Sequence, residues 1–177
     1  MSWLIALSLI HMSMMSSKVL HDFNFSDNLT DWTIINDGVM GGLSKGAIAL
    51  SEEGHGVFSG YISLANNGGF SSVRKRFESV IVVPYQKIVI RVKGDGKRYQ
   101  LRLKTSASDA HSYINYFDTS GEWEEIVFDL VTFYPTFRGR KLTMPNYPKK
   151  TLEELAILIG NKKAESFCLE IDYVILK

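Results

Sequence analysis

The chain has 177 residues, which fits one domain, and folding at that length buries roughly two-thirds of the surface of the unfolded chain. A core of that extent needs no disulfide or metal to hold it, and a single cysteine, Cys168, excludes an internal disulfide framework. Lys and Arg total 20 against 19 Asp and Glu, so the composition argues against a bulk electrostatic partner such as nucleic acid or an anionic membrane. It does not argue against a local charged patch.

Residues 1–17 form an apolar N-terminal segment that begins MSWLIALSLIHMSMM. At a rise of about 1.5 Å per residue this segment is too short to span a bilayer comfortably, so we expect no stable membrane span. It resembles the apolar region of a signal peptide, but no Lys or Arg precedes that region and no A-x-A-like site follows it. The alternative is an over-extended start, with Met12, Met14 or Met15 as the initiator. The first interpretation predicts export and the second predicts a cytoplasmic protein, so the localisation stays open.

From Phe23 onward, short alternating runs are separated by Gly, Asn and Asp, which is typical of β-strands joined by turns. The stretch NDGVMGG at 36–42 is a turn, because its Asn, Asp and Gly residues tolerate positive φ. Residues 56–64 and 70–77 are β-prone and flank the turn residues at 67–69, so the pattern predicts a hairpin there.

The clearest alternation lies at 88–104, around the turn Gly94-Asp95-Gly96. We expect a second hairpin whose one face is apolar, with Ile88, Ile90, Val92, Tyr99, Leu101 and Leu103. Its other face carries five cations, which are Arg91, Lys93, Arg98, Arg102 and Lys104. Such a face suits a phosphate-rich ligand or an acidic protein. The alternative is a solvated outer face whose charges pair with acids on a neighbouring strand, such as Glu125 and Asp129.

Two more strands are predicted at 123–130 and 167–176, and we expect Cys168 to be a buried thiol in the second of them. Residues 151–154 (TLEE) have the form of a capping box and suggest a short helix start before the buried strand LAILIG. Residues 134–150 contain three prolines and are interpreted as a long ordered loop. Many short strands at similar spacing predict an all-β antiparallel sandwich or jelly roll, with residues 18–177 as its single domain.

Motifs for catalysis are missing. The sequence has no G-x-S-x-G elbow, H-E-x-x-H, Walker loop or C-x-x-C pair, so we expect no enzyme, no cofactor and no metal centre. Asp37, Asp95 and Asp118 lie near turns, and a pair of carboxylates flanking a glycosidic bond would hydrolyse it. Turn aspartates also hydrogen-bond their own backbone, and this structural role is the favoured interpretation.

Taken together, several segments resemble the complex I intermediate-associated protein 30 family. The matching segments are WTIINDGVMGGLSKG (32–46), FSGYISLANNGGFSSVR (58–74), VKGDGKRYQLRLKT (92–105), FYPTFRGRKL (133–142) and LAILIGNKKAESFCLEIDYV (155–174). The resemblance covers nearly the whole chain from about Lys18, and the order and spacing of the segments make it specific. It implies a jelly roll of the galactose-binding-domain-like type without catalytic activity. It also implies a role like that of the mitochondrial members, which hold intermediates during assembly of respiratory complex I.

The resemblance and the loops together give a set of candidate residues for binding a partner or ligand. These are Asp37, Met40, Asn66, Asn67, Arg74, Asp95, Arg138 and Arg140. For the NDGVMGG loop, the structural interpretation is that Asn and Asp cap nearby amides while Met40 plugs one end of the sandwich. The functional interpretation makes Met40 an apolar contact for a partner, with Asp37 and Arg74 as polar contacts. Arg138 and Arg140 are interface candidates because exposed loop arginines favour protein contacts.

The sequence therefore predicts a non-catalytic protein-binding domain that acts as an assembly factor or chaperone for respiratory complex I or another multi-subunit complex. Its partners would be protein subunits of that complex. The alternative is a carbohydrate-binding module of the same fold, with an aromatic-lined concave face and in some cases a structural Ca²⁺. Protein docking predicts an exposed apolar patch rimmed by charge instead.

Overall fold

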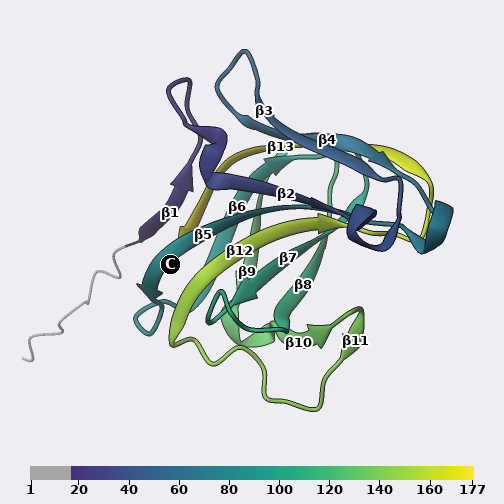
Figure 1. Cartoon of the computed structure of the whole chain (residues 1–177). Coiled ribbons are helices and arrows are strands. Elements are labelled where there is room, and N and C mark those ends of the chain that lie inside the picture. The colour runs from purple at the N-terminus through teal and green to yellow at the C-terminus, as the bar shows by residue number, and fades with distance from the viewer. Residues whose placement is uncertain (1–16) are drawn as a thin grey trace, which may run out of the picture.

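The computed structural model of the chain describes residues 17–177, apart from the side chains of Val39 and Met40. Residues 1–16 of the apolar N-terminal segment lie outside the described residues. Two antiparallel sheets pack face to face, as Figure 1 shows, and one apolar core lies between them. No helix in the described range has the length and apolar character needed to cross a membrane.

Sheet A has six strands. In spatial order five of them are β3 (Lys45–Leu50), β4 (Gly56–Ile62), β13 (Glu165–Leu176), β6 (Lys87–Lys93) and β9 (Trp123–Asp129), and β1 (Lys18–Asp22) also pairs with β13. Sheet B has seven strands, in the order β11 (Arg140–Lys141), β10 (Tyr134–Phe137), β8 (Ser112–Asp118), β7 (Arg98–Lys104), β12 (Thr151–Ile159), β5 (Ser71–Ile81) and β2 (Trp32–Asn36). Four short 3-10 helices, η1 (Leu29–Asp31), η2 (Asp37–Met40), η3 (Ala65–Asn67) and η4 (Leu130–Thr132), lie in the connections.

The core forms because period-two alternation turns one face of each strand inward. Ile88, Ile90 and Val92 of β6 and Tyr99, Leu101 and Leu103 of β7 are all fully buried. These two groups enter the same core from opposite sheets. The predicted all-β antiparallel sandwich of the jelly-roll type is confirmed.

Both predicted hairpins are wrong, for one physical reason. The arms at 88–104 belong to β6 in sheet A and β7 in sheet B, and the arms around 67–69 belong to β4 in sheet A and β5 in sheet B. A chain that crosses from one layer to the other also presents alternating apolar residues to the shared core. The alternation is therefore the same for a hairpin and for a crossing between sheets.

The crossing divides the expected five-cation face. Arg91 of β6 pairs with Asp172 on the outer face of sheet A, and Lys93 Nζ lies 3.7 Å from Glu170 Oε1. The other three cations, Arg98, Arg102 and Lys104, lie on β7 in sheet B. The charges of β6 therefore meet acids on a neighbouring strand, as the solvated-face interpretation expected, but those acids are on β13.

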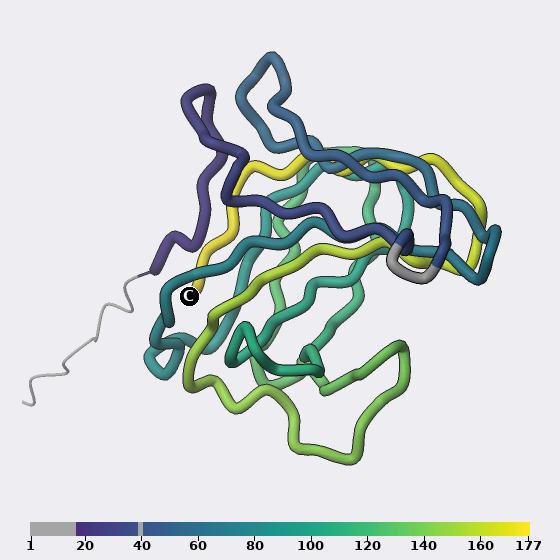
Figure 2. Tube along the Cα trace, in the orientation of Figure 1, coloured from purple at the N-terminus to yellow at the C-terminus, as the bar shows by residue number. Residues whose placement is uncertain are grey.

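Three local expectations near the C-terminal half also change. The capping-box pattern at 151–154 does not start a helix, because the segment joins β12, with a β-bulge between Leu152 and Glu154. The expected long loop contains the short strands β10 and β11, and Figure 2 shows the rest of it extending from the lower edge of sheet B. Cys168 is exposed, because its neighbours Phe167 and Leu169 take the inward positions of β13.

Candidate functional site

A cleft of about 790 Å³ runs across the outer face of sheet B, which we call the sheet B cleft. Its floor is formed by outward side chains of β5, β12, β7 and β8. One end is bounded by Asn67 and Gly69 in the connection before β5, and the other by β10 and the loop that carries Arg138 and Gly139. In Figure 1 these strands fan from β2 through β5, β12 and β7 to β8 and β10.

The strand register sets the rows of side chains on the floor. Ala156 in β12 lies opposite Arg74 in β5 on one side and Arg102 in β7 on the other. In the next row, Glu154 lies between Arg76 and Lys104. Directly opposed residues in antiparallel strands have Cβ atoms about 4.5–5.5 Å apart, so each row is a set of contacting neighbours.

Glu154 is the shared counter-ion of the floor and is buried. Its Oε2 lies 3.2 Å from Arg76 Nε and 3.7 Å from Arg74 Nη1, and its Oε1 lies 3.8 Å from Lys104 Nζ. One carboxylate thus faces three cations. Burial lowers the pKa of the Arg102 guanidinium, and the positive charge of Arg74 lowers it further, while Tyr116 and Glu154 oppose the shift.

Two tyrosines form the aromatic part of the cleft. Tyr116 comes from β8 and Tyr134 from β10, and both are half-buried. Arg98 stands 4.2 Å from the centroid of the Tyr116 ring, and Lys141 Nζ stands 5.1 Å from that of Tyr134. Burial raises the pKa of Tyr134, and the neighbouring Tyr116 adds to the shift. Cations therefore already cover one face of each ring.

The end of the cleft at Gly69 is held in place by a buried carboxylate, Asp37. Its Oδ2 accepts hydrogen bonds from Gly69 N at 2.6 Å, Phe70 N at 3.3 Å and the Ser44 hydroxyl at 2.5 Å, and its Oδ1 accepts one from Ser44 N at 3.0 Å. Burial alone would raise the pKa of Asp37, but these hydrogen bonds, led by that of the Ser44 hydroxyl, lower it below its usual value. The NDGVMGG turn thus fastens the wall of the cleft.

Glycines leave the space that this carboxylate needs. A Cβ atom on Gly42 would lie 2.2 Å from Asp37 Oδ1, and one on Gly68 would lie 2.5 Å from Asp37 Oδ2. Asn66 adopts a left-handed φ of 55°, and its side-chain amide donates to Gly41 O at 2.9 Å. In Figure 1, η2 and η3 lie together at one end of the sandwich, which brings these two turns side by side.

The predicted candidates fall into distinct places. Asn67, Arg74 and Arg138 line the sheet B cleft, whereas Asp37 lies beneath its wall and Asn66 joins the two turns. Arg140 is exposed on β11 and does not line the cleft. The side chain of Met40 lies outside the described residues.

Asp95 is placed away from the cleft, in the crossing from β6 to β7. It accepts hydrogen bonds from Lys97 Nζ at 2.7 Å, from the Tyr99 hydroxyl at 2.9 Å and from the Cys168 amide at 2.9 Å. Burial would raise its pKa, and these partners, led by Lys97, lower it instead. The residue ties the crossing to β13.

Ala156 and Glu154 are cleft residues that sequence reasoning did not single out. Ala156 and Glu154 lie in a segment whose apolar pattern marks a core strand, so the pattern indicates its inward face and not its outward one. Arg102 was placed correctly on an outer face, but its neighbours come from β12, about 50 residues further on. The alternation in this segment did indicate the outward face of the strand, because residues 154, 156 and 158 alternate with the buried residues 155, 157 and 159.

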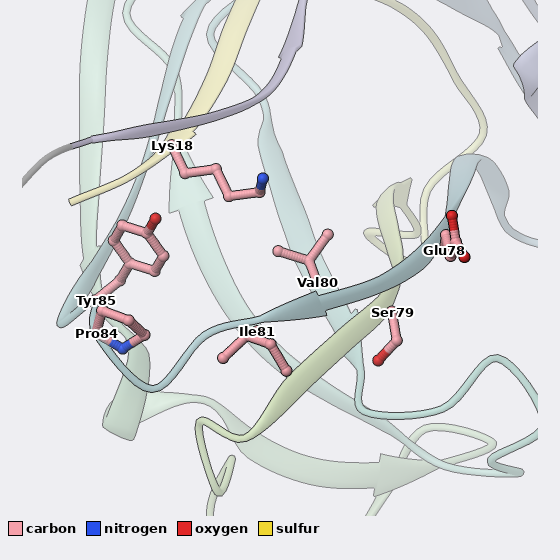
Figure 3. A pocket seen from close by; sticks show the side chains of 7 residues that line it. All are labelled: Lys18, Glu78, Ser79, Val80, Ile81, Pro84 and Tyr85. Atoms are coloured by element: carbon pink, nitrogen blue, oxygen red, sulfur yellow. The ribbon is translucent and has the colours of Figure 1, made fainter.

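Two other features have the form of sites. A depression of about 610 Å³ lies beside β1 and β5, and Figure 3 shows Lys18, Val80 and Tyr85 around it. On sheet A, Glu53, His55 and Glu170 each bring a ligand atom within 4.8 Å of the others, the spacing of a metal site. Glu170 Oε1 also lies 3.7 Å from Lys93 Nζ, so the ammonium group of Lys93 already pairs with one of these three residues.

The two antiparallel sheets form a jelly roll of the galactose-binding-domain-like type, as the likeness to solved structures shows, and the sheet B cleft lies across the outer face of one of them. The chain is similar to the family 11 carbohydrate-binding module from Clostridium thermocellum in complex with a beta-1,3-1,4-mixed-linked tetrasaccharide, with a TM-score of 0.63 and 15% identity over 90% of this chain and 94% of that one. The family 11 carbohydrate-binding module of the cellulosomal cellulase Lic26A-Cel5E of Clostridium thermocellum gives a TM-score of 0.65 at 14% identity, over 91% of this chain and 94% of that one. At these identities the likeness concerns the fold.

The chain belongs to the complex I intermediate-associated protein 30 family, whose model matches residues 21–171. A relative from Drosophila melanogaster, "Complex I intermediate-associated protein 30, mitochondrial", is 26% identical over 183 residues. That alignment covers 89% of this chain and 62% of the relative, so the chain spans less than two-thirds of the relative's length.

Proposed function

We propose that this protein acts by binding and not by catalysis, and that it holds a protein subunit or intermediate of a larger complex. Respiratory complex I is the first candidate, because the name of the Drosophila relative associates that protein with complex I intermediates. The binding domain in this proposal comprises residues 18–177, and the contact surface is the sheet B cleft. The cleft would cover the matching surface of the partner and so keep the partner from other contacts until the next subunit of the complex binds.

One observation carries the proposal. The two ends of the cleft are built by segments through which the chain resembles its family, the ANNGG stretch with Asn67 and Gly69 and the FRGR stretch with Arg138 and Gly139. Asp37 of the NDGVMGG stretch fixes the first of these ends. Three of the stretches that carry the resemblance therefore meet at one open surface.

An oligosaccharide is the second candidate ligand, because Tyr116 and Tyr134 lie in a cleft of a fold shared with carbohydrate-binding modules. Sugar rings stack on aromatic faces, and here Arg98 and Lys141 each occupy one face of these rings. The cationic covering favours a protein ligand over a neutral sugar.

Affinity purification of the tagged chain from its native host, followed by mass spectrometry, tests the proposal. Ala156→Trp fills the floor of the cleft, and Val127→Trp adds the same side chain at an exposed position on sheet A as a matched control. We expect the wild type and Val127→Trp to recover the same respiratory-complex subunits, and Ala156→Trp to lose them. Equal recovery by all three proteins would contradict the proposed surface.

Affinity electrophoresis through a mixed-linked β-glucan gel tests the second candidate in parallel. We expect no retardation of the wild type relative to Ala156→Trp. Retardation of the wild type that Ala156→Trp abolishes, with no protein partner recovered, would replace protein binding by carbohydrate binding.

A further inference from the structure

Positively charged side chains are concentrated in the sheet B cleft, although the whole chain is almost neutral. The described residues lining it include five cations, Arg74, Arg102, Lys104, Arg138 and Lys141, and one carboxylate, Glu154. The whole chain has 20 cationic and 19 acidic side chains, so this surface carries more than its share of the positive charge. The field of such a cleft attracts an anionic ligand.

The positive charge with the fewest acidic partners lies in the row Arg74–Ala156–Arg102. Glu154, in the next row, is shared by three cations at 3.2–3.8 Å. Arg102 donates from Nη1 to the neutral amide oxygen of Gln100 at 3.3 Å, and no salt bridge between Arg102 and a carboxylate is found within the described range. In that range the buried Nε of Arg74 has no hydrogen-bond partner.

Ala156 is a small, buried residue of the cleft floor, and it places no long side chain between Arg74 and Arg102, which line the cleft on either side of it. Like charges two strands apart on one face repel each other, and a carboxylate between them would remove the repulsion and accept charge-assisted hydrogen bonds from both. Arginine presents a planar set of donors that suits a carboxylate in this position. The buried Nε of Arg74 is a further donor that has no partner among the described residues.

We propose that the sheet B cleft binds an acidic peptide segment of the partner protein, with one Asp or Glu carboxylate seated over Ala156 between Arg74 and Arg102. This inference rests on the proposed function, which makes the ligand a protein. Lys104, Arg138 and Lys141 extend the cationic surface along the cleft, so neighbouring acids of the same segment meet further cations.

A titration with a fluorescently labelled hexaglutamate peptide tests the inference, with hexaglutamine as the neutral control. We expect the wild type to bind hexaglutamate at least tenfold more tightly than hexaglutamine, since a lost charge-assisted hydrogen bond weakens binding by about tenfold or more. Binding should weaken strongly between about 0.1 M and about 1 M salt, as the Debye length falls from about 10 Å to about 3 Å.

Substitutions at Ala156 separate charge from size. Ala156→Glu supplies the carboxylate from the chain itself, so we expect it to abolish hexaglutamate binding. Ala156→Gln fills the same space without the charge, so we expect it to weaken binding less. The melting temperature of Ala156→Glu should exceed that of Ala156→Gln, because the new carboxylate pairs with two arginines. Arg102→Gln should weaken peptide binding at least tenfold, and Arg91→Gln on the outer face of sheet A should leave it unchanged.

Equal binding of the two peptides, or equal binding by Ala156→Glu and Ala156→Gln, would overturn the inference. Tighter binding of polygalacturonate than of hexaglutamate would also overturn it, in favour of an acidic polysaccharide. The proposed function fails separately, since it depends on recovery of complex subunits by the wild type and their loss with Ala156→Trp. If that loss occurs without any preference for the acidic peptide, the protein-binding role stands and the acidic ligand does not.

Discussion

Replacing Asp37 by Asn should destabilise the fold more than any exposed Asp→Asn change, because the carboxylate connects the NDGVMGG turn to Ser44 and to the backbone that follows the ANNGG turn. The Asn side chain has one acceptor oxygen and one NH₂ group. If its oxygen faces Gly69, Phe70 and the Ser44 hydroxyl, its NH₂ group faces the Ser44 amide, which lies 3.0 Å from Asp37 Oδ1. Two donors then point at each other within a buried site.

The expected cost follows from these contacts. A buried donor left without an acceptor costs about 1–3 kcal/mol, and hydrogen bonds to a charged acceptor are worth about 1 kcal/mol more than neutral ones. We therefore expect Asp37→Asn to lower the free energy of unfolding by about 2–4 kcal/mol, out of a total of about 5–15 kcal/mol for a domain. This corresponds to a fall of about 1–2 M in the urea midpoint.

The effect has a defined pH dependence. Because the folded-state pKa of Asp37 is lowered, the unfolded state takes up the proton more readily as the pH falls. The stabilisation by Asp37 is complete above the unfolded pKa of about 3.9 and is lost as the pH falls through the folded-state value. The gap between wild type and Asp37→Asn should stay constant from about pH 5 to 8 and narrow below about pH 4.

Urea unfolding followed by tryptophan fluorescence measures both effects. Asp31→Asn is the matched control, since Asp31 is 66% exposed and pairs with Lys75 on the surface at 3.0 Å. We expect the control to change the free energy of unfolding by less than about 1 kcal/mol. A loss below about 0.5 kcal/mol for Asp37→Asn at pH 7 would refute the structural role assigned to its carboxylate.

Two further substitutions test the turns and the crossing between the sheets. Gly42→Ala should destabilise the protein strongly because its Cβ would lie 2.2 Å from Asp37 Oδ1, whereas Gly38→Ala, with open space around its Cβ, serves as the control with little effect in the same urea experiment. Tyr99→Phe removes a hydrogen bond of 2.9 Å to Asp95 and should cost about 1 kcal/mol, measured by thermal unfolding. An unchanged melting temperature for Tyr99→Phe would contradict a stabilising role of that hydrogen bond.

Much of the fold follows from alternation alone. Ile88, Ile90 and Val92 face the core as their spacing predicts, because burying one face of a strand is the main energetic reason for the pattern. Alternation does not say which strand pairs with which. The turns at 67–69 and 94–96 look like hairpin turns, yet both carry the chain from one sheet to the other.

The cleft is harder to predict for a related reason. Arg74 and Arg102 become neighbours of Ala156 through the registers of β5 with β12 and of β7 with β12, and register between strands distant in sequence leaves no local signal. The two ends of the cleft were easier to predict from the sequence, because their Gly and Asn residues are the ones that tight turns require. Sequence reasoning therefore located the ends of the cleft better than its floor.

The position of β12 has a consequence for the order in which the cleft appears during synthesis. β5 and β7 are translated well before β12, which begins at Thr151, yet β12 lies between them in the sheet. Until it is inserted, Arg74 and Arg102 belong to two separate strand edges. A partner that recognises both arginines together would thus not bind nascent chains and would bind only molecules in which β12 has paired with both β5 and β7.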